Sequence, residues 1–212
     1  MKKVLLVIAL AAVCASCGGK IDELKKGIDA AQQLSKAGKA IEEGQADAKK
    51  MAADRATKGD TVAMPFKDLE GYIPTSIPGY KVEGEPSGMS NSGATGSTMS
   101  QASQKFVSES GDGSHLTVML VDAGGSEAAN AYAGLAAMGI NSEDAHQKIE
   151  SIKLDPTTSG VATFDKDNKN STVAVVTRYR YMVTVTTEGG KEDETGKLKD
   201  AVSEIAKKFD GK

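Results

Sequence analysis

Short segments in which apolar and polar residues alternate follow one another from about residue 104 to residue 187. The clearest is 115–121, where Leu116, Val118 and Leu120 occupy every second position. A period of two is typical of a strand that buries one of its faces. Further strands are expected at 104–108, 148–154, 161–164, 172–177 and 180–187. Because the strands after residue 161 have no helices between them, we expect them to pair antiparallel.

Two helices are predicted to flank this series of strands. The first runs from Ser126, a suitable N-cap, to Met138, and Gly139 ends it. The second spans about 194–209. Its spacing places five apolar residues on one face: Leu198, Ala201, Val202, Ile205 and Phe209. The predicted fold class is therefore α+β, with an antiparallel sheet and helices packed on one side of it.

The connection between the last two strands has no obvious turn residue. The stretch from Thr177 to Arg180 contains no Gly, Asn or Pro, the residues that tight hairpin turns favour. Residues 171–187 therefore form either a hairpin with an unusual turn or one long strand that bends. The sequence leaves both open.

The folded domain is predicted to span residues 60–212, a length that suits a single core. Near its start, Pro65 suits the first turn of a short helix that Gly71 and Pro74 end. The following stretch, 84–104, is rich in Gly, Ser, Thr, Asn and Gln, and its only bulky apolar residues are two Met. That composition predicts a loop.

The first residues of the chain form a predicted secretory signal, residues 1–16. Lys2 and Lys3 precede an apolar run from Val4 to Val13. Ten residues of helix measure roughly 15 Å, about half of a bilayer core of ~30 Å, so this run is too short for an ordinary transmembrane span.

The end of this signal, Cys14-Ala15-Ser16-Cys17, resembles the lipobox of bacterial lipoproteins. The resemblance implies cleavage before Cys17, lipid attachment to its thiol, and a stable association with a membrane through the acylated residue. The alternative is an ordinary secreted protein that is cut after Ala15 or Ser16 and keeps Cys17 as a free thiol.

The residues after Cys17 indicate a location. Gly18 to Glu23, with Lys20 beside two acids, is similar to a short export signal that sends lipoproteins to the cell surface in one Gram-negative phylum. Gly18 also differs from the Asp of the familiar inner-membrane retention signal. We therefore expect a protein of the outer membrane whose domain faces either the periplasm or the outside.

Residues 17–59 comprise the lipidated Cys and a predicted helical stalk or spacer. Between 21 and 58 there is no Pro or aromatic residue, and the larger apolar residues form one narrow stripe. This segment is either a self-associating helix that makes the protein an envelope scaffold or a solvated, partly helical spacer. Residues 18–59 carry nine basic and seven acidic side chains, whereas 60–212 carry fifteen and twenty-two. An acidic domain of this kind is not expected to bind nucleic acid.

No catalytic or metal-binding motif is present in the sequence. His115 and His146 each lack a second His or Cys at ligand spacing, so neither metal ions nor cofactors are expected. The stretch that begins at Asp165 resembles the start of a calcium loop, but Val176 stands where the last ligand belongs. A hydrolase that uses distant carboxylates, such as Asp122 or Asp165, remains an alternative because such sites leave no local motif.

The sequence contains one basic and aromatic cluster: Arg178, Tyr179, Arg180 and Tyr181. In a continuous strand the two Arg would share one face and the two Tyr the other. The cluster is then either a patch for an anionic or glycan ligand or an exposed Arg pair above a Tyr-lined core. Separately, Thr61 lies in Asp60-Thr61-Val62, which resembles the O-glycosylation acceptor of the same phylum.

The string PFKDLEGYIPTSIPGYK (residues 65–81) and the strand and helix that end the chain together resemble an uncharacterised bacterial envelope domain. This resemblance covers about 64–209 and implies no activity or cofactor. The sequence therefore predicts a lipid-anchored envelope protein whose domain is a non-catalytic binding or structural module with a protein or glycan partner.

Overall fold

The computed structural model describes residues 42–92, 98–124, 139–190 and 192–210. All of them belong to one unit that runs from Lys36 to Lys212. The predicted signal, Cys17, most of the predicted stalk and the helix predicted at 126–138 lie outside the described residues.

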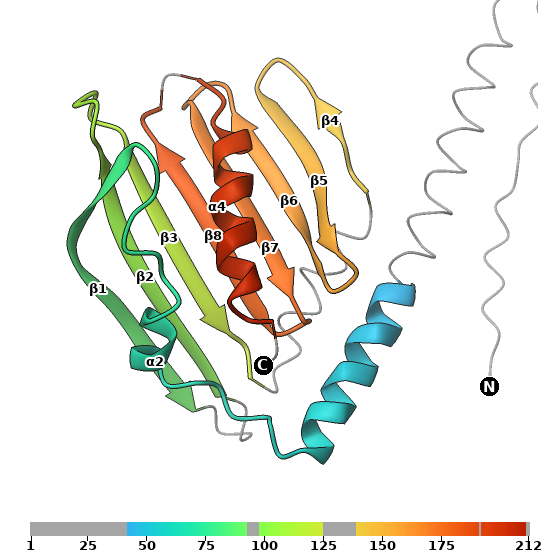
Figure 1. Cartoon of the computed structure of the whole chain (residues 1–212). Coiled ribbons are helices and arrows are strands. Elements are labelled where there is room, and N and C mark those ends of the chain that lie inside the picture. The colour runs from blue at the N-terminus through green and yellow to red at the C-terminus, as the bar shows by residue number, and fades with distance from the viewer. Residues whose placement is uncertain (1–41, 93–97, 125–138, 191, 211–212) are drawn as a thin grey trace, which may run out of the picture. The chain divides into compact units, whose positions relative to one another are not determined.

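The centre of the fold is an eight-stranded sheet in the order β1-β2-β3-β8-β7-β6-β5-β4, in which all neighbours are antiparallel (Figure 1). The strands are β1 (Tyr80–Ser92), β2 (Thr98–Ser108), β3 (His115–Asp122), β4 (Ser142–Glu143), β5 (Gln147–Asp155), β6 (Thr158–Asp165), β7 (Asn170–Thr177) and β8 (Tyr181–Glu188). The coarse prediction of an antiparallel α+β fold is thus confirmed.

Two helices cover the same face of this sheet (Figure 1). The short α2 (Phe66–Glu70) packs on β1, β2 and β3, and α4 (Thr195–Lys207) packs on β6, β7 and β8. Residues 42–57 are also helical. The predicted apolar face of the final helix is confirmed, because Leu198, Val202 and Ile205 are buried.

The main core lies between the helices and the sheet. Alternate residues of the central strands, such as Leu116, Val118 and Val183, are completely buried there. Phe209 lies between the rings of Tyr72 and Tyr181, with centroid distances of 4.6 and 4.3 Å. The chain has few aromatic residues, and three of them form one stack below the end of α4.

The loop predicted at 84–104 is wrong for most of its length, because β1 and β2 pair there at six positions, from Ser87 with Ser103 to Ser92 with Thr98. Ser and Gly favour turns by composition, yet backbone hydrogen bonds to a neighbouring strand do not depend on side chains. The small polar residues also bond across the pair, since the hydroxyl of Ser90 lies 2.9 Å from that of Ser100. The register shifts between Glu83 and Ser87, where the strand bulges.

Residues 171–187 form a hairpin rather than one bent strand. Thr177 pairs with Tyr181, and the N–H of Arg180 donates to the carbonyl oxygen of Thr177 at 3.2 Å. Arg178 and Tyr179 have φ values of 54° and 52°, the φ pattern of a type I′ turn. The alternation of Arg and Tyr that a continuous strand would give does not occur, because 178–180 form the turn and Tyr181 begins β8.

Candidate functional site

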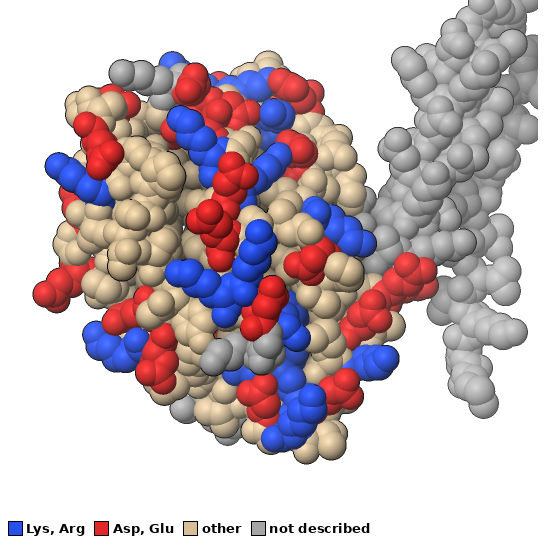
Figure 2. All heavy atoms as spheres, viewed as in Figure 1, with Lys and Arg blue, Asp and Glu red and all other residues tan. Residues whose placement is uncertain are grey.

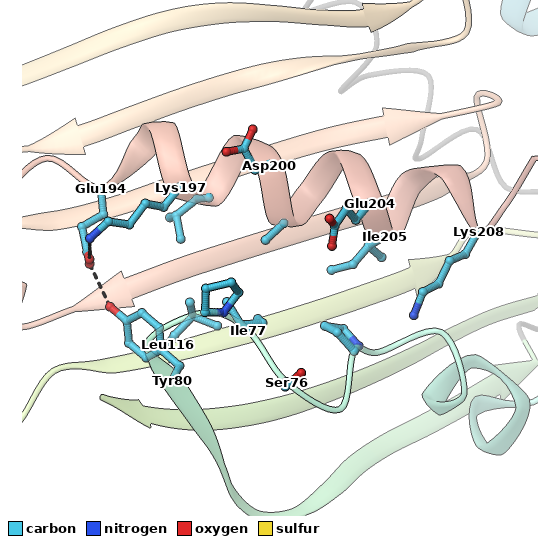
Figure 3. Close-up of a pocket in the computed structure, with 14 residues that line it drawn as sticks. Ser76, Ile77, Tyr80, Leu116, Glu194, Lys197, Asp200, Glu204, Ile205 and Lys208 are labelled. Atoms are coloured by element: carbon cyan, nitrogen blue, oxygen red, sulfur yellow. Dashed lines mark hydrogen bonds and ion pairs between the residues drawn. The ribbon is translucent and has the colours of Figure 1, made fainter. Parts of the chain in front are cut away.

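A groove on the helix-covered side of the sheet is the best candidate for a binding site. It lies between α4 and the segment 74–80, and it encloses about 230 Å³ (Figure 3). Its apolar lining includes Ile77, Leu116, Leu198 and Ile205. β3 contributes Leu116 and α4 contributes Leu198 and Ile205, so the sheet and the helix both take part in the lining.

A tight turn gives the groove its second wall. In Ile77-Pro78-Gly79-Tyr80, the N–H of Tyr80 donates to the carbonyl oxygen of Ile77 at 2.9 Å, and Gly79 has a φ of 83°. Pro at the second position and a residue with positive φ at the third are the requirements of a type II turn. The backbone geometry of the turn therefore fixes this wall, because the ring of Pro78 already restricts the φ of that residue.

A hydrogen bond closes one end of the groove. The hydroxyl of Tyr80 donates to Oε2 of Glu194 at 2.9 Å (Figure 3). Burial raises the pKa of Tyr80 to about 12, and the bond to Glu194 adds to the effect. The other oxygen of Glu194 lies 3.3 Å from Nζ of Lys197. The first turn of α4 is thus joined to the start of β1.

The remaining charges at the groove come from the outer side of α4. Glu204 is turned toward the segment of Ser76, whereas Asp200, one turn earlier, points away from it (Figure 3). Neither carboxylate belongs to any ion pair found among the described residues. Lys208 donates to the carbonyl oxygen of Tyr72 instead. The surface around α4 carries both signs of charge (Figure 2), and Glu204 is exposed on it.

The polar side chains that line the groove include three carboxylates, Glu194, Asp200 and Glu204. Its described lining includes one serine hydroxyl, Ser76, and neither His nor Cys. A nucleophilic hydroxyl needs a base within hydrogen-bond reach, and the lining supplies no imidazole for that role. Within the described parts of the chain, no three metal-ligating side chains of the His, Cys, Asp and Glu types come together.

The structure separates the predicted cluster of Arg178, Tyr179, Arg180 and Tyr181. Arg180 is only 4% exposed, and Tyr181 is buried in the aromatic stack. Arg178 and Tyr179 are half-buried in the turn. The four residues therefore do not present two Arg on one face of a strand.

The guanidinium of Arg180 is held by two carboxylates. Its Nε and Nη2 donate to the two oxygens of Asp122 at 2.6 and 2.9 Å, and Nη1 donates to Oδ1 of Asp60 at 2.7 Å. Burial alone would lower the pKa of Arg180, but these hydrogen bonds raise it above its ordinary value. Asp122, a carboxylate that the hydrolase alternative named, is thus engaged with Arg180.

A second, more polar hollow lies beside this ion pair. It encloses about 430 Å³ and is lined by residues of 51–60 and by Arg178, Arg180 and Tyr181. Two of its four cations are engaged, since Nη1 of Arg55 donates to the carbonyl oxygen of Arg178 at 3.1 Å and Arg180 binds Asp60. We prefer the groove at α4 as the candidate site because its lining is more apolar.

The other residues singled out from the sequence lie apart from the groove. Thr61 is half-exposed in the segment between the 42–57 helix and α2. His115 lies 3.2 Å from Glu83, and His146 lies 2.8 Å from Asp167. Asp165 accepts the N–H groups of Asp167 and Asn168 in the polar turn that follows it.

Sequence reasoning did not find the groove, because its residues come from three distant parts of the chain. The available signals were the Pro78-Gly79 turn and the apolar face of the final helix. Only the fold shows that Ala201, on this face, stays partly exposed beside the turn while Leu198 and Ile205 are buried.

Comparisons with known proteins found no relative. No protein-family model, curated protein or solved structure matches this chain. In the parts of the chain that the structure describes, no helix has both the length and the apolar character needed to cross a bilayer.

Proposed function

We propose that this chain is a lipid-anchored protein of the bacterial outer membrane whose folded domain is a non-catalytic module that binds a protein partner. The anchor is proposed from the sequence, in which a short apolar run and two small residues precede Cys17. The binding role is carried by one structural observation, the open apolar groove between α4 and the segment 74–80.

The lining of the groove favours a polypeptide over a glycan. Sugar rings are commonly held by exposed aromatic faces and by free polar groups. Here the aromatic residue of the lining, Tyr80, is buried and its hydroxyl is bonded to Glu194. The lining instead provides an apolar surface for an apolar side chain. Pro74, Pro78 and Ala201 reach solvent there, whereas Ile77, Leu116 and Ile205 are themselves buried. A partner residue such as Leu or Met would remove this surface from water.

The carboxylate beside the groove indicates a second property of the partner. Glu204 is turned toward the groove and has no cationic partner among the described side chains. A basic group next to the apolar anchor of the partner would pair with it at a site partly screened from water. Such a pair contributes chiefly to specificity and to the rate of association. We therefore expect an apolar residue flanked by Lys or Arg.

The groove is tested with the full chain carrying Cys17→Ala, which needs no detergent. The probe is phenylnaphthylamine, a neutral compound whose fluorescence rises in apolar sites, and the competitors are hexylamine and hexanoate. We expect probe binding that Ala201→Trp abolishes, because Ala201 lines the groove. Ser203→Trp, on the same helix but outside the lining, is the control. Equal binding by wild type and Ala201→Trp would refute a groove site.

The role of Glu204 is tested in the same assay. Hexylamine should displace the probe at a several-fold lower concentration than hexanoate does. Glu204→Gln should remove most of that difference, whereas Asp200→Asn should have a smaller effect, because Asp200 points away from the segment of Ser76. Equal displacement by the amine and the acid in the wild type would contradict the expected basic partner group.

A further inference from the structure

The outer half of β1 is an edge without the usual protection against pairing. β1 is the last strand on its side of the sheet and has one neighbour, β2 (Figure 1). An edge strand leaves every second backbone N–H and C=O free to pair with another strand. β1 carries Lys81 and Glu83 before the bulge and Glu85 and Pro86 within it, but residues 87–91 contain no charge and no Pro.

The opposite edge of the same sheet has the protection that residues 87–91 of β1 lack. β4 is only two residues long, and β5 beyond it carries Lys153, Asp155 and an irregular register. The side chain and backbone of Ser151 also bond to the segment 140–141. Short strands, charges, bulges and covering loops are the devices that prevent pairing between sheets. Their absence from residues 87–91 therefore distinguishes one edge from the other.

Two exposed Met side chains lie beside this unprotected edge. Met89 is 61% exposed in β1, and Met99 is 39% exposed in β2. Met89 pairs with Gln101 and Asn91 pairs with Met99, so both Met are on the same face of the sheet as diagonal neighbours. On the other face, the N–H of Phe66 donates to the hydroxyl of Ser90. α2 thus covers one face of these strands, while Met89 remains open to solvent on the other.

We propose that residues 87–91 of β1 pair antiparallel with the same residues of a second copy of this chain, about a twofold axis at Met89. In this register Met89 faces Met89 of the partner subunit, Ser87 lies opposite Asn91, and Gly88 lies opposite Ser90. The two sheets join into one, and each Met covers the other at cross-strand distances of roughly 4.5–5.5 Å between Cβ atoms.

The pattern of charges argues for a second copy as the occupant. An antiparallel pair of residues 87–91 about Met89 brings together only uncharged residues, because Glu85 lies within the bulge and Lys81 and Glu83 lie beyond it on each strand. The segment is also its own complement in size, since small residues flank the Met on both sides. A twofold interface needs such self-complementarity. This proposal does not depend on the groove or on its partner.

The register is tested by cross-linking in membranes of cells that produce the full chain. Met89→Cys places two thiols opposite each other across the axis, and mild oxidation should give a disulfide-linked dimer. Leu154→Cys, at an exposed position near the other edge, and the unmodified chain are the controls. The proposal would be overturned if Met89→Cys gave no more disulfide-linked dimer than Leu154→Cys. It would also be overturned if the thiol at position 89 formed its disulfide with another protein instead.

A second measurement does not depend on thiol chemistry. Sedimentation equilibrium of the full chain with Cys17→Ala should show a dimer that Met89→Lys weakens at least tenfold, because two ammonium groups would then face each other. Leu154→Lys, an equivalent change away from β1, should leave the dimer unchanged. A monomer at all concentrations, or equal masses for the two Lys variants, would contradict the proposal while leaving the groove untouched.

Discussion

Arg180 and Asp122 form a buried ion pair with two hydrogen bonds, Nε to Oδ1 at 2.6 Å and Nη2 to Oδ2 at 2.9 Å. The same carboxylate accepts the N–H groups of Met64 and Gly124, and the same guanidinium donates to Asp60 and to the carbonyl oxygen of Val62. The pair therefore joins the end of β3, the β7–β8 turn and the segment that enters the domain. Its role is structural.

Loss of the Arg180 guanidinium should destabilise the domain strongly. Arg180→Met leaves the Asp122 carboxylate buried without its cation, and breaking a buried pair from one side costs about 3–5 kcal/mol. The measurement is urea unfolding of the full chain with Cys17→Ala. A loss below about 1 kcal/mol would show that water or another group replaces the guanidinium.

The neighbouring turn residue should respond in the opposite direction. Arg178 has a φ of 54°, which is strained for a residue with a Cβ and is adopted more readily by Asn. Its hydrogen bonds use only the backbone, to Thr157 and from Arg55. Arg178→Asn should therefore raise the free energy of unfolding by about 0.5–1 kcal/mol. A clear loss of stability would show that the Arg178 side chain contributes to the fold.

Gly160 marks the closest approach between β6 and β7. A Cβ at this position would lie 1.9 Å from the carbonyl oxygen of Ala174 and 2.6 Å from Cα of Val175. Because both neighbours are backbone, Gly160→Ala should cost at least about 2–3 kcal/mol. Gly196→Ala, where nothing lies within 4 Å, should instead gain up to about 0.5–1 kcal/mol in α4. Equal effects in thermal unfolding would contradict this packing.

Two tyrosines of the core, Tyr80 and Tyr181, should lose their protons only at high pH. Burial raises the pKa of Tyr80 and that of Tyr181 to about 12 each, from an ordinary value of 10.0. The folded state thus favours the neutral phenols, so their contribution to stability is complete below pH 10 and is lost as the pH rises toward 12. Ultraviolet titration of the phenols provides the measurement.

One variant separates the titration of Tyr80, which lies at the groove, from that of Tyr181. Glu194→Gln removes the carboxylate that accepts the hydrogen bond of Tyr80, so the pKa of Tyr80 should move back toward 10 while that of Tyr181 stays high. Tyr80→Phe identifies the signal. An unchanged titration in Glu194→Gln would mean that this hydrogen bond does not close the groove.

The strands were predictable wherever alternation reports one buried face, as in β3, where Leu116, Val118 and Leu120 turn into the core. β1 and the first half of β2 were not, because an edge pair with small polar side chains has no such pattern. The hairpin at Arg178 and Tyr179 was undecidable for a related reason. Its positive φ values are stabilised by Arg180, Asp122 and Asp60, contacts that span 58 and 120 residues.

The candidate site was less predictable than the fold. Its walls come from β3, α4 and a Pro-Gly turn, and no local motif connects Leu116 with Ile205. The basic and aromatic cluster was visible in the sequence, but the buried carboxylate that binds Arg180 lies 58 residues earlier. Local sequence patterns indicate which residues are buried. They do not indicate which of the buried residues contact one another.

Anchoring through Cys17 is the part of the proposed function on which the location depends. The most direct test is mass spectrometry of the amino-terminal peptide of the chain isolated from membranes of its own host. We predict that this peptide begins at Cys17 and carries the added mass of two or three acyl chains. An amino terminus after Ala15 or Ser16 with an unmodified Cys17 would contradict the lipid anchor.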